Sequence, residues 1–167
     1  GVDSKGIATK RRDYCKYVQN CYQEIIDSVM LDYSEEGLKR NIEIFRKYIN
    51  NIETYNVNVD DLVVSALLAK QYKTNPVHVI LAQKLKERNE EVQVGTRIPY
   101  IYIESDDPKK QKSELGEDPE YAKRNNLKFN RGCYLEQLSK PILSFFSVIL
   151  HNDQNLLNEI LDYTNER

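Results

Sequence analysis

Apolar residues recur at helical spacing in the first third of the chain and predict two paired helices. The apolar positions of the first segment are Val18, Cys21, Tyr22, Ile25, Ile26 and Val29, and those of the second are Leu38, Ile42, Phe45, Ile49 and Ile52. Both sets recur at steps of three and four residues, which places each on one face of a helix. Between them, Ser34 followed by two acidic residues is typical of a helix start. We therefore predict a helical hairpin from about Asp13 to Glu53.

The next part of the chain holds one short apolar run and one helix signal. The run 62–68 is too short to be assigned to a helix or to a strand. Further on, Asn75 and Pro76 form the usual pair of an N-cap and a first-turn proline. They predict a helix that runs to about Arg88, and Asn89 is a suitable end for it.

The pattern then changes from helical to extended. A turn is expected at residues 95–96, and residues 97–103 are rich in β-branched and aromatic side chains, which predicts a strand. Pro99 has no backbone N–H, so the strand is expected to begin there or to lie at a sheet edge.

The last third returns to helical signals. A short helix is expected between residues 117 and 126, and a longer one from Arg131 to Leu150 with a break at Pro141, because an interior proline removes a hydrogen bond. Apolar residues at 156–161 suffice for a last short helix. The predicted fold is α+β and mainly helical: a helical hairpin, further helices and a small antiparallel sheet.

Composition and charge narrow the class of protein. The 167 residues are 40% hydrophobic and 30% charged, which is typical of a globular chain that buries a core. No apolar run approaches the roughly 18 residues that a membrane-spanning helix needs, so no membrane partner is expected. The net charge of −2 excludes nucleic-acid binding through bulk positive charge but leaves room for a local basic patch.

Motifs of self-contained enzymes are missing from the sequence. It contains no glycine-rich phosphate loop, no GxSxG, no HExxH and no CxxC pair. Asp60-Asp61 and Asp106-Asp107 are acidic pairs of the kind that can hold a metal ion. The first pair follows a polar turn that needs a helix cap, and the second lies in a charged loop. We predict no catalytic residue, no metal site and no cofactor within this chain.

A basic cluster near the start of the chain is a candidate for contacts with nucleic acid. Lys5, Lys10, Arg11 and Arg12 lie within eight positions of a segment without apolar periodicity. They form either a strip that contacts phosphates or a solvated terminus, and charge alone does not separate the two.

Two further clusters lie near predicted element ends. Lys70, Tyr72 and Lys73 precede a predicted helix N-terminus, where free N–H groups also favour anions. Arg97 stands at a turn that leads into a strand. The Tyr72 ring is expected either on a sugar-phosphate backbone or in the core, and His78 is expected to have a structural role.

Five segments in order carry a family resemblance. They are KGIATKRRD at 5–13, PVHVILA at 76–82, VGTRIPYI at 94–101, EDPEY with two asparagines at 117–126, and YLEQL with Pro-Ile at 134–142. Their order and spacing resemble the family B DNA polymerases, the delta-like and large-virus branches especially. The resemblance runs from about residue 5 to residue 150.

The resemblance implies the thumb of such a polymerase, which wraps the primer–template duplex behind the active site. Residues 1–12 would connect the palm to the thumb, residues 13–150 would form the thumb, and residues 151–167 would be a helical tail. The implied DNA-binding residues are Lys5, Lys10, Arg11, Arg12, Lys70, Tyr72, Lys73 and Arg97. With about four to six phosphate contacts, the logarithm of affinity should fall with a slope of roughly −4 to −5 against log salt.

The resemblance also implies what lies outside this chain. The metal-binding aspartates with their Mg²⁺ and the nucleotide-binding fingers would lie there, so the chain alone is expected to be inactive. The expected partners are primer–template DNA and the rest of the polymerase, with a processivity factor as a further candidate. The expected setting is intracellular, in the nucleus or at a viral replication site in the cytoplasm. The chain stops without the cysteine-rich modules of eukaryotic members, which favours a viral or otherwise tailless member.

Departures from the family pattern and one alternative function remain. Thr96 stands where the family usually has an acid, and Gly116 where it usually has alanine. The alternative is a non-enzymatic helical module that binds a protein partner through the apolar face from Leu38 to Ile52, with the N-terminal cations merely solvated. Salt-dependent binding of duplex DNA separates the two functions.

Overall fold

The computed structural model describes residues 14–149, which divide into two compact units. Unit 1 contains the described residues 14–54 and 134–149, and unit 2 is Tyr55–Cys133. The two units subdivide the predicted thumb, 13–150. The boundaries expected near residues 12 and 150 fall at the edges of the described range and stay predictions.

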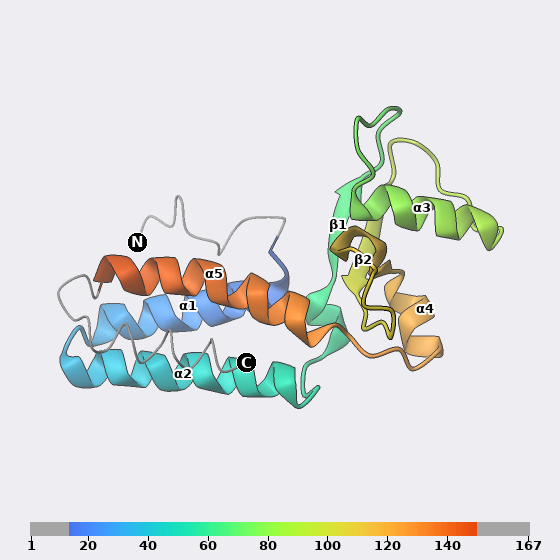
Figure 1. The fold of residues 1–167 in the computed structure, drawn as a ribbon. Coiled ribbons are helices and arrows are strands. Elements are labelled where there is room, and N and C mark those ends of the chain that lie inside the picture. The colour runs from blue at the N-terminus through green and yellow to red at the C-terminus, as the bar shows by residue number, and fades with distance from the viewer. Residues whose placement is uncertain (1–13, 150–167) are drawn as a thin grey trace. The chain divides into compact units, whose positions relative to one another are not determined.

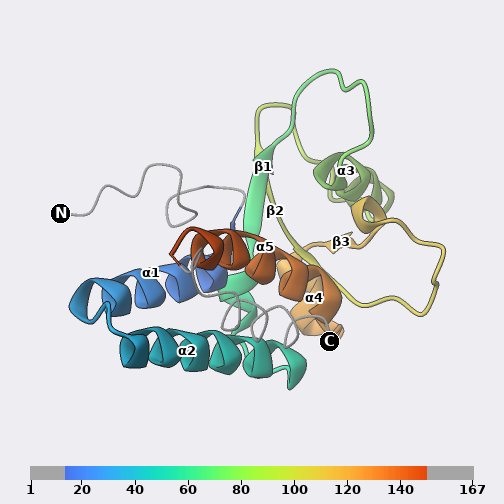
Figure 2. The ribbon, with the colours of Figure 1, turned by 60° about the vertical axis from the view of Figure 1, so that its left-hand side comes forward.

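Unit 1 contains the helical hairpin, as the apolar spacing predicts. Helix α1 (Lys16–Leu31) and helix α2 (Glu35–Glu53) lie side by side in Figures 1 and 2. The Ser34 hydroxyl accepts a hydrogen bond from the Gly37 N–H, which confirms the predicted cap. The apolar face of α2 is packed inside the unit, with Phe45 1% exposed and Ile52 fully buried. This face is therefore not open for a protein partner, which removes the surface that the alternative function needed.

Helix α5 (Arg131–Ile149) corrects the prediction of a break at Pro141. The helix continues through the proline without interruption. An interior proline forfeits one backbone hydrogen bond, but burial of the same helix face offsets this loss. That face consists of Tyr134, Leu138, Ile142 and Phe146, all at most 1% exposed.

Unit 2 is built on a small antiparallel sheet in the order β1-β2-β3. The strands are β1 (Val64–Leu67), β2 (Arg97–Tyr102) and β3 (Gly116–Glu117), so the unassigned apolar run is in part a strand. Strand β2 is central, yet β3 pairs only with Ile101 and Tyr102. Pro99 pairs with Ser65 on one side and has no β3 neighbour on the other, so it occupies a local edge that needs no N–H donor.

Helix α3 (Val77–Glu87) packs on this sheet through Leu81, Leu85 and Ile98. The predicted start was wrong by one position: Pro76 is the N-cap, and no side chain caps this end. The predicted end is confirmed, because Asn89 adopts a left-handed backbone with φ 62°.

Arg88, the C-cap of α3, joins three elements of unit 2. Its guanidinium donates to both carboxylate oxygens of Glu117 at 2.7 and 3.0 Å and lies 3.6 Å from the ring centre of Tyr121. Tyr121 belongs to the short helix α4 (Pro119–Arg124), which lies in the range where a short helix was predicted and which Asp118 caps. Burial alone would raise the pKa of Glu117, but the hydrogen bonds from Arg88 and from the Asp118 N–H hold that pKa below its usual value.

Gly116 is required by close packing rather than by its backbone conformation. A Cβ at this position would lie 2.2 Å from Cγ2 of Val77. A methyl group at position 116 would therefore have to displace Val77.

Replacing Gly116 with alanine is expected to destabilise unit 2 by about 1–3 kcal/mol, the usual cost of overpacking. The added methyl group would push against Val77 at the start of α3. Hydrogen exchange of the backbone amides of 77–87 measures the effect. The double variant Gly116→Ala with Val77→Ala should recover part of the loss, and a Gly116→Ala variant as stable as the parent would contradict the packing argument.

Candidate nucleic-acid interface

One end of the sheet in unit 2 brings two separate loops together. The Leu68 N–H donates to the Thr96 carbonyl at 2.9 Å, and the Gly95 N–H donates to the Leu68 carbonyl at 2.8 Å. These bonds extend the pairing of β1 with β2 beyond Leu67 and Arg97. The loop 68–76 therefore starts beside the turn 93–96, and both loops are seen beyond the same end of the sheet in Figure 1. Gly95, with φ 93°, supplies the backbone that this turn requires.

Two of the predicted cations lie on loop 68–76, and a third, Arg97, is the first residue of β2 after the turn. Lys70 and Lys73 are exposed, and neither makes a hydrogen bond or an ion pair with another residue of the range 14–149. Arg97 is also exposed, but its Nε donates to Ser65 Oγ at 3.0 Å and its Nη2 to the Ser65 carbonyl at 2.8 Å. The sheet thus holds one arginine in a fixed direction, whereas the two lysines project from a loop.

Tyr72 lies on the same loop and is more constrained than the sequence suggests. Its hydroxyl accepts from the Ala69 N–H at 2.8 Å, donates to the Leu67 carbonyl at 2.8 Å and contacts Nε2 of His78 at 2.7 Å. Its ring meets the His78 ring edge to face at 5.2 Å. Tyr72 is 37% exposed, so it is neither in the core nor fully on the surface.

His78 contributes structure to this site, in line with its expected role. Burial lowers the pKa of His78, and the nearby Leu67 carbonyl opposes this only in part. A histidine with a lowered pKa is neutral at pH 7. The positive charge at this end of unit 2 therefore comes from the lysines and Arg97.

The N-terminal cluster lies outside the described residues. Lys5, Lys10, Arg11 and Arg12 all precede residue 14, so their predicted role in DNA binding stays a prediction.

A second group of cations in unit 2 was missed by the sequence analysis. Lys128 and Arg131 lie 4.7 and 4.6 Å from the ring centre of Tyr55. Glu104 accepts from the Tyr55 hydroxyl at 2.6 Å and from Arg131 at 3.1 Å, which neutralises the arginine. The partners come from three distant segments, so no local pattern could have revealed them.

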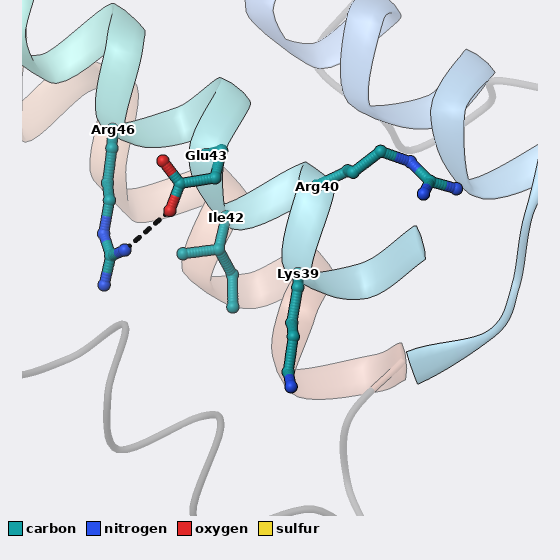
Figure 3. A pocket seen from close by; sticks show the side chains of 5 residues that line it. All are labelled: Lys39, Arg40, Ile42, Glu43 and Arg46. Atoms are coloured by element: carbon teal, nitrogen blue, oxygen red, sulfur yellow. Dashed lines mark hydrogen bonds and ion pairs between the residues drawn. The ribbon is translucent and has the colours of Figure 1, made fainter. Parts of the chain in front are cut away.

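A shallow pocket of about 260 Å³ on α2 in unit 1 also carries cations (Figure 3). Its lining residues are Lys39, Arg40, Ile42, Glu43 and Arg46. Arg46 donates to Glu43 at 2.8 Å, and Arg40 pairs with Asp32. Each arginine is thus already paired with an acid of the same hairpin, so this pocket has less unpaired positive charge than loop 68–76.

The acidic pairs do not form a metal site in the described part of the chain. Asp60 pairs with Lys123 at 2.5 Å, and Asp107 accepts from the backbone N–H of Lys109. Among residues 14–149, no group of three or more potential metal ligands comes together. None of the described helices is both long and apolar enough to cross a bilayer.

Comparison with known proteins links this geometry to one family. The model of DNA polymerase family B matches residues 1–149. The DNA polymerase delta catalytic subunit of Plasmodium falciparum is 34% identical over 160 residues, which cover 94% of this chain and 14% of that protein. The corresponding subunit of Arabidopsis thaliana is 32% identical over 157 residues, again 14% of its length. These relatives support the delta-like branch, and the chain spans only a small part of their length.

A solved structure agrees on the fold. The family B DNA polymerase of the hyperthermophilic archaeon Pyrobaculum calidifontis matches 86% of this chain with a TM-score of 0.65 at 20% identity, over 18% of its own length. The mainly helical architecture with a small antiparallel sheet is thus a known part of such an enzyme. Because the family model covers nearly the whole chain, this chain belongs to DNA polymerase family B.

Proposed function

We propose that this chain is the thumb region of a DNA-directed DNA polymerase and that it grips the primer–template duplex through the phosphate backbone. The observation that carries the proposal is that loop 68–76, which carries Lys70 and Lys73, both unpaired within residues 14–149, begins at the end of the unit 2 sheet where β2 starts with Arg97. Lysine and arginine contacts to phosphates hold a duplex without reading its sequence, as a polymerase that moves along DNA requires. Such contacts need positive charge on one face only, so the net charge of −2 is compatible with them.

The rest of the site follows from the sequence. Lys5, Lys10, Arg11 and Arg12 would extend the phosphate contacts along the segment that joins palm and thumb. Catalytic carboxylates and their Mg²⁺ would lie in other parts of the polymerase, which would be partners of this chain together with the DNA. The setting would be intracellular, and a processivity factor is a further candidate partner.

Removing the three cations of unit 2 is expected to weaken duplex binding and to reduce its salt dependence. In the native protein in which this chain occurs, the triple variant Lys70→Ala, Lys73→Ala, Arg97→Ala should bind a labelled primer–template about 10- to 100-fold more weakly. Each lost phosphate contact should make the slope of log affinity against log salt shallower by about 0.9, or about 2–3 for all three. Fluorescence anisotropy at several salt concentrations measures both quantities.

A double substitution in unit 1 controls for the general effect of removing surface lysines. Lys39→Ala with Lys140→Ala removes two exposed lysines of unit 1 that pair with acids one helical turn away. This variant should keep the affinity and the salt slope of the parent. If the triple variant also keeps both, loop 68–76 and Arg97 are not part of the grip, and the proposal fails for this site.

A further inference from the structure

The loop that carries Lys70 and Lys73 depends on a single side chain. Residues 69–75 are all exposed, and none of them makes a backbone–backbone hydrogen bond to another residue in 14–149. The loop is instead fastened through the Tyr72 hydroxyl, which binds Ala69 at its start, Leu67 in β1 and His78 in α3. One oxygen atom thus joins the loop to both elements that it connects.

The proton positions in this arrangement are consistent with a stable junction. The hydroxyl has one proton, which goes to the Leu67 carbonyl, and two lone pairs, one of which accepts from the Ala69 N–H. The other lone pair accepts from His78 when its Nε2 carries the ring proton. A neutral histidine can carry its one ring proton on Nε2, and the lowered pKa of His78 favours the neutral form. The Tyr72 hydroxyl then uses its proton and both of its lone pairs.

We propose that Tyr72 is a positioning residue for DNA binding: its hydroxyl holds loop 68–76 in the shape in which Lys70 and Lys73 contact the phosphate backbone of the duplex. The proposal rests on the proposed function of these lysines. A loop without other backbone anchors would have to be ordered on binding, and this lost freedom lowers affinity. By holding the loop in place before DNA binds, the Tyr72 hydroxyl lowers the entropy that is lost on binding. The sequence-based hypothesis differs, because it lets the Tyr72 ring itself pack on the sugar-phosphate backbone.

Tyr72→Phe separates the two roles, since it keeps the ring and removes only the hydroxyl. In the native protein, we expect a labelled primer–template to bind about 3- to 10-fold more weakly, the range expected for the loss of a hydrogen bond. The backbone amide of Ala69 should exchange its hydrogen faster, because its acceptor is gone. Tyr33→Phe, at a tyrosine that is 63% exposed in unit 1, is the matched control and should change neither quantity.

A double-mutant cycle tests whether Tyr72 acts through the lysines. In a background with Lys70→Ala and Lys73→Ala, the same Tyr72→Phe change should alter affinity by less than about twofold, because coupled residues are not additive. A purely structural role elsewhere in unit 2 would give the same loss in both backgrounds.

The outcomes are distinct. Loss of affinity that disappears in the lysine-free background supports the inference. Parent-like affinity of Tyr72→Phe overturns it, and so does an equal loss in both backgrounds. If Tyr72→Phe is silent but Tyr72→Ala weakens binding, the ring is the contact, and the positioning role is again overturned. If removing the two lysines has no effect at all, the proposed function of the loop fails together with the inference, whereas the other negative outcomes leave that function intact.

Discussion

Replacing Arg88 with alanine is expected to destabilise unit 2 by about 3 kcal/mol, since removing one partner of a buried ion pair leaves an uncompensated charge. The other partner, Glu117, is 3% exposed and accepts two hydrogen bonds from Arg88. The variant would also lose the packing of the guanidinium on Tyr121. Hydrogen exchange of the amides in 77–87 and 116–124 should accelerate about a hundredfold.

An exposed ion pair of the same unit provides the control. Lys123 pairs with Asp60 and Glu120, and all three side chains are partly or largely exposed. Lys123→Ala should therefore cost at most about 1 kcal/mol. Equal effects of the two substitutions would show that burial of Glu117 does not matter.

The pH dependence of the Arg88→Ala effect gives a second check. In the parent, the pKa of Glu117 lies below its usual value, so its contribution to stability is complete above about pH 4.5 and is lost as the pH falls through the lowered pKa. Without Arg88, burial is expected to raise the pKa of Glu117. Protonation of Glu117 then removes the unpaired buried charge and restores part of the variant's stability. The difference in stability between parent and variant should then shrink from pH 7 to about pH 4. A difference that stays constant over this range would contradict the assignment of the effect to Glu117.

Replacing Phe45 with alanine is expected to lower the stability of the helical hairpin by about 3–5 kcal/mol, the usual cost of a large cavity in a core. Phe45 is 1% exposed on the inner face of α2. Phe45 lies among the buried residues of α2, so exposed side chains cannot move in to fill the cavity that its removal leaves. The hydrogen exchange of amides in α1 and α2 measures the loss.

Two control variants, Phe45→Leu and Tyr33→Ala, are expected to have smaller effects. Phe45→Leu keeps most of the apolar volume and should cost clearly less than the alanine variant. Tyr33→Ala removes an aromatic ring that is 63% exposed and should be almost neutral. A Phe45→Ala variant that exchanges like the parent would mean that the hairpin does not depend on this core.

The apolar spacing was sufficient to predict the hairpin, and local chemistry was sufficient to predict several element ends. The Ser34 cap and the left-handed Asn89 both depend on residues within a few positions of each other. Local patterns also led to two wrong predictions, the start of α3 and the break at Pro141. At Asn75-Pro76 the usual capping pair is displaced by one residue, and at Pro141 the burial of Leu138 and Ile142 overrides the proline.

The family could also be predicted from the order of five segments, because sequence similarity is carried by the residues themselves. Of the candidate site, the sequence identified which residue types could contact phosphates, including Lys70, Lys73 and Arg97. The sequence could not show that Arg97 lies at the end of the sheet where loop 68–76 begins. The two are linked by the pairing of Leu68 with Gly95 and Thr96, which are more than twenty residues away along the chain.

Only the tertiary structure decided how Tyr72, Glu117 and Gly116 are used. The three partners of the Tyr72 hydroxyl, the buried contact of Glu117 with Arg88, and the approach of Val77 to Gly116 all depend on how elements pack. Hydrophobic periodicity and capping follow from the few residues around a position, and so they are written in the sequence. Burial, ion pairing and close approach depend on which distant segments meet, and that is determined when the chain folds.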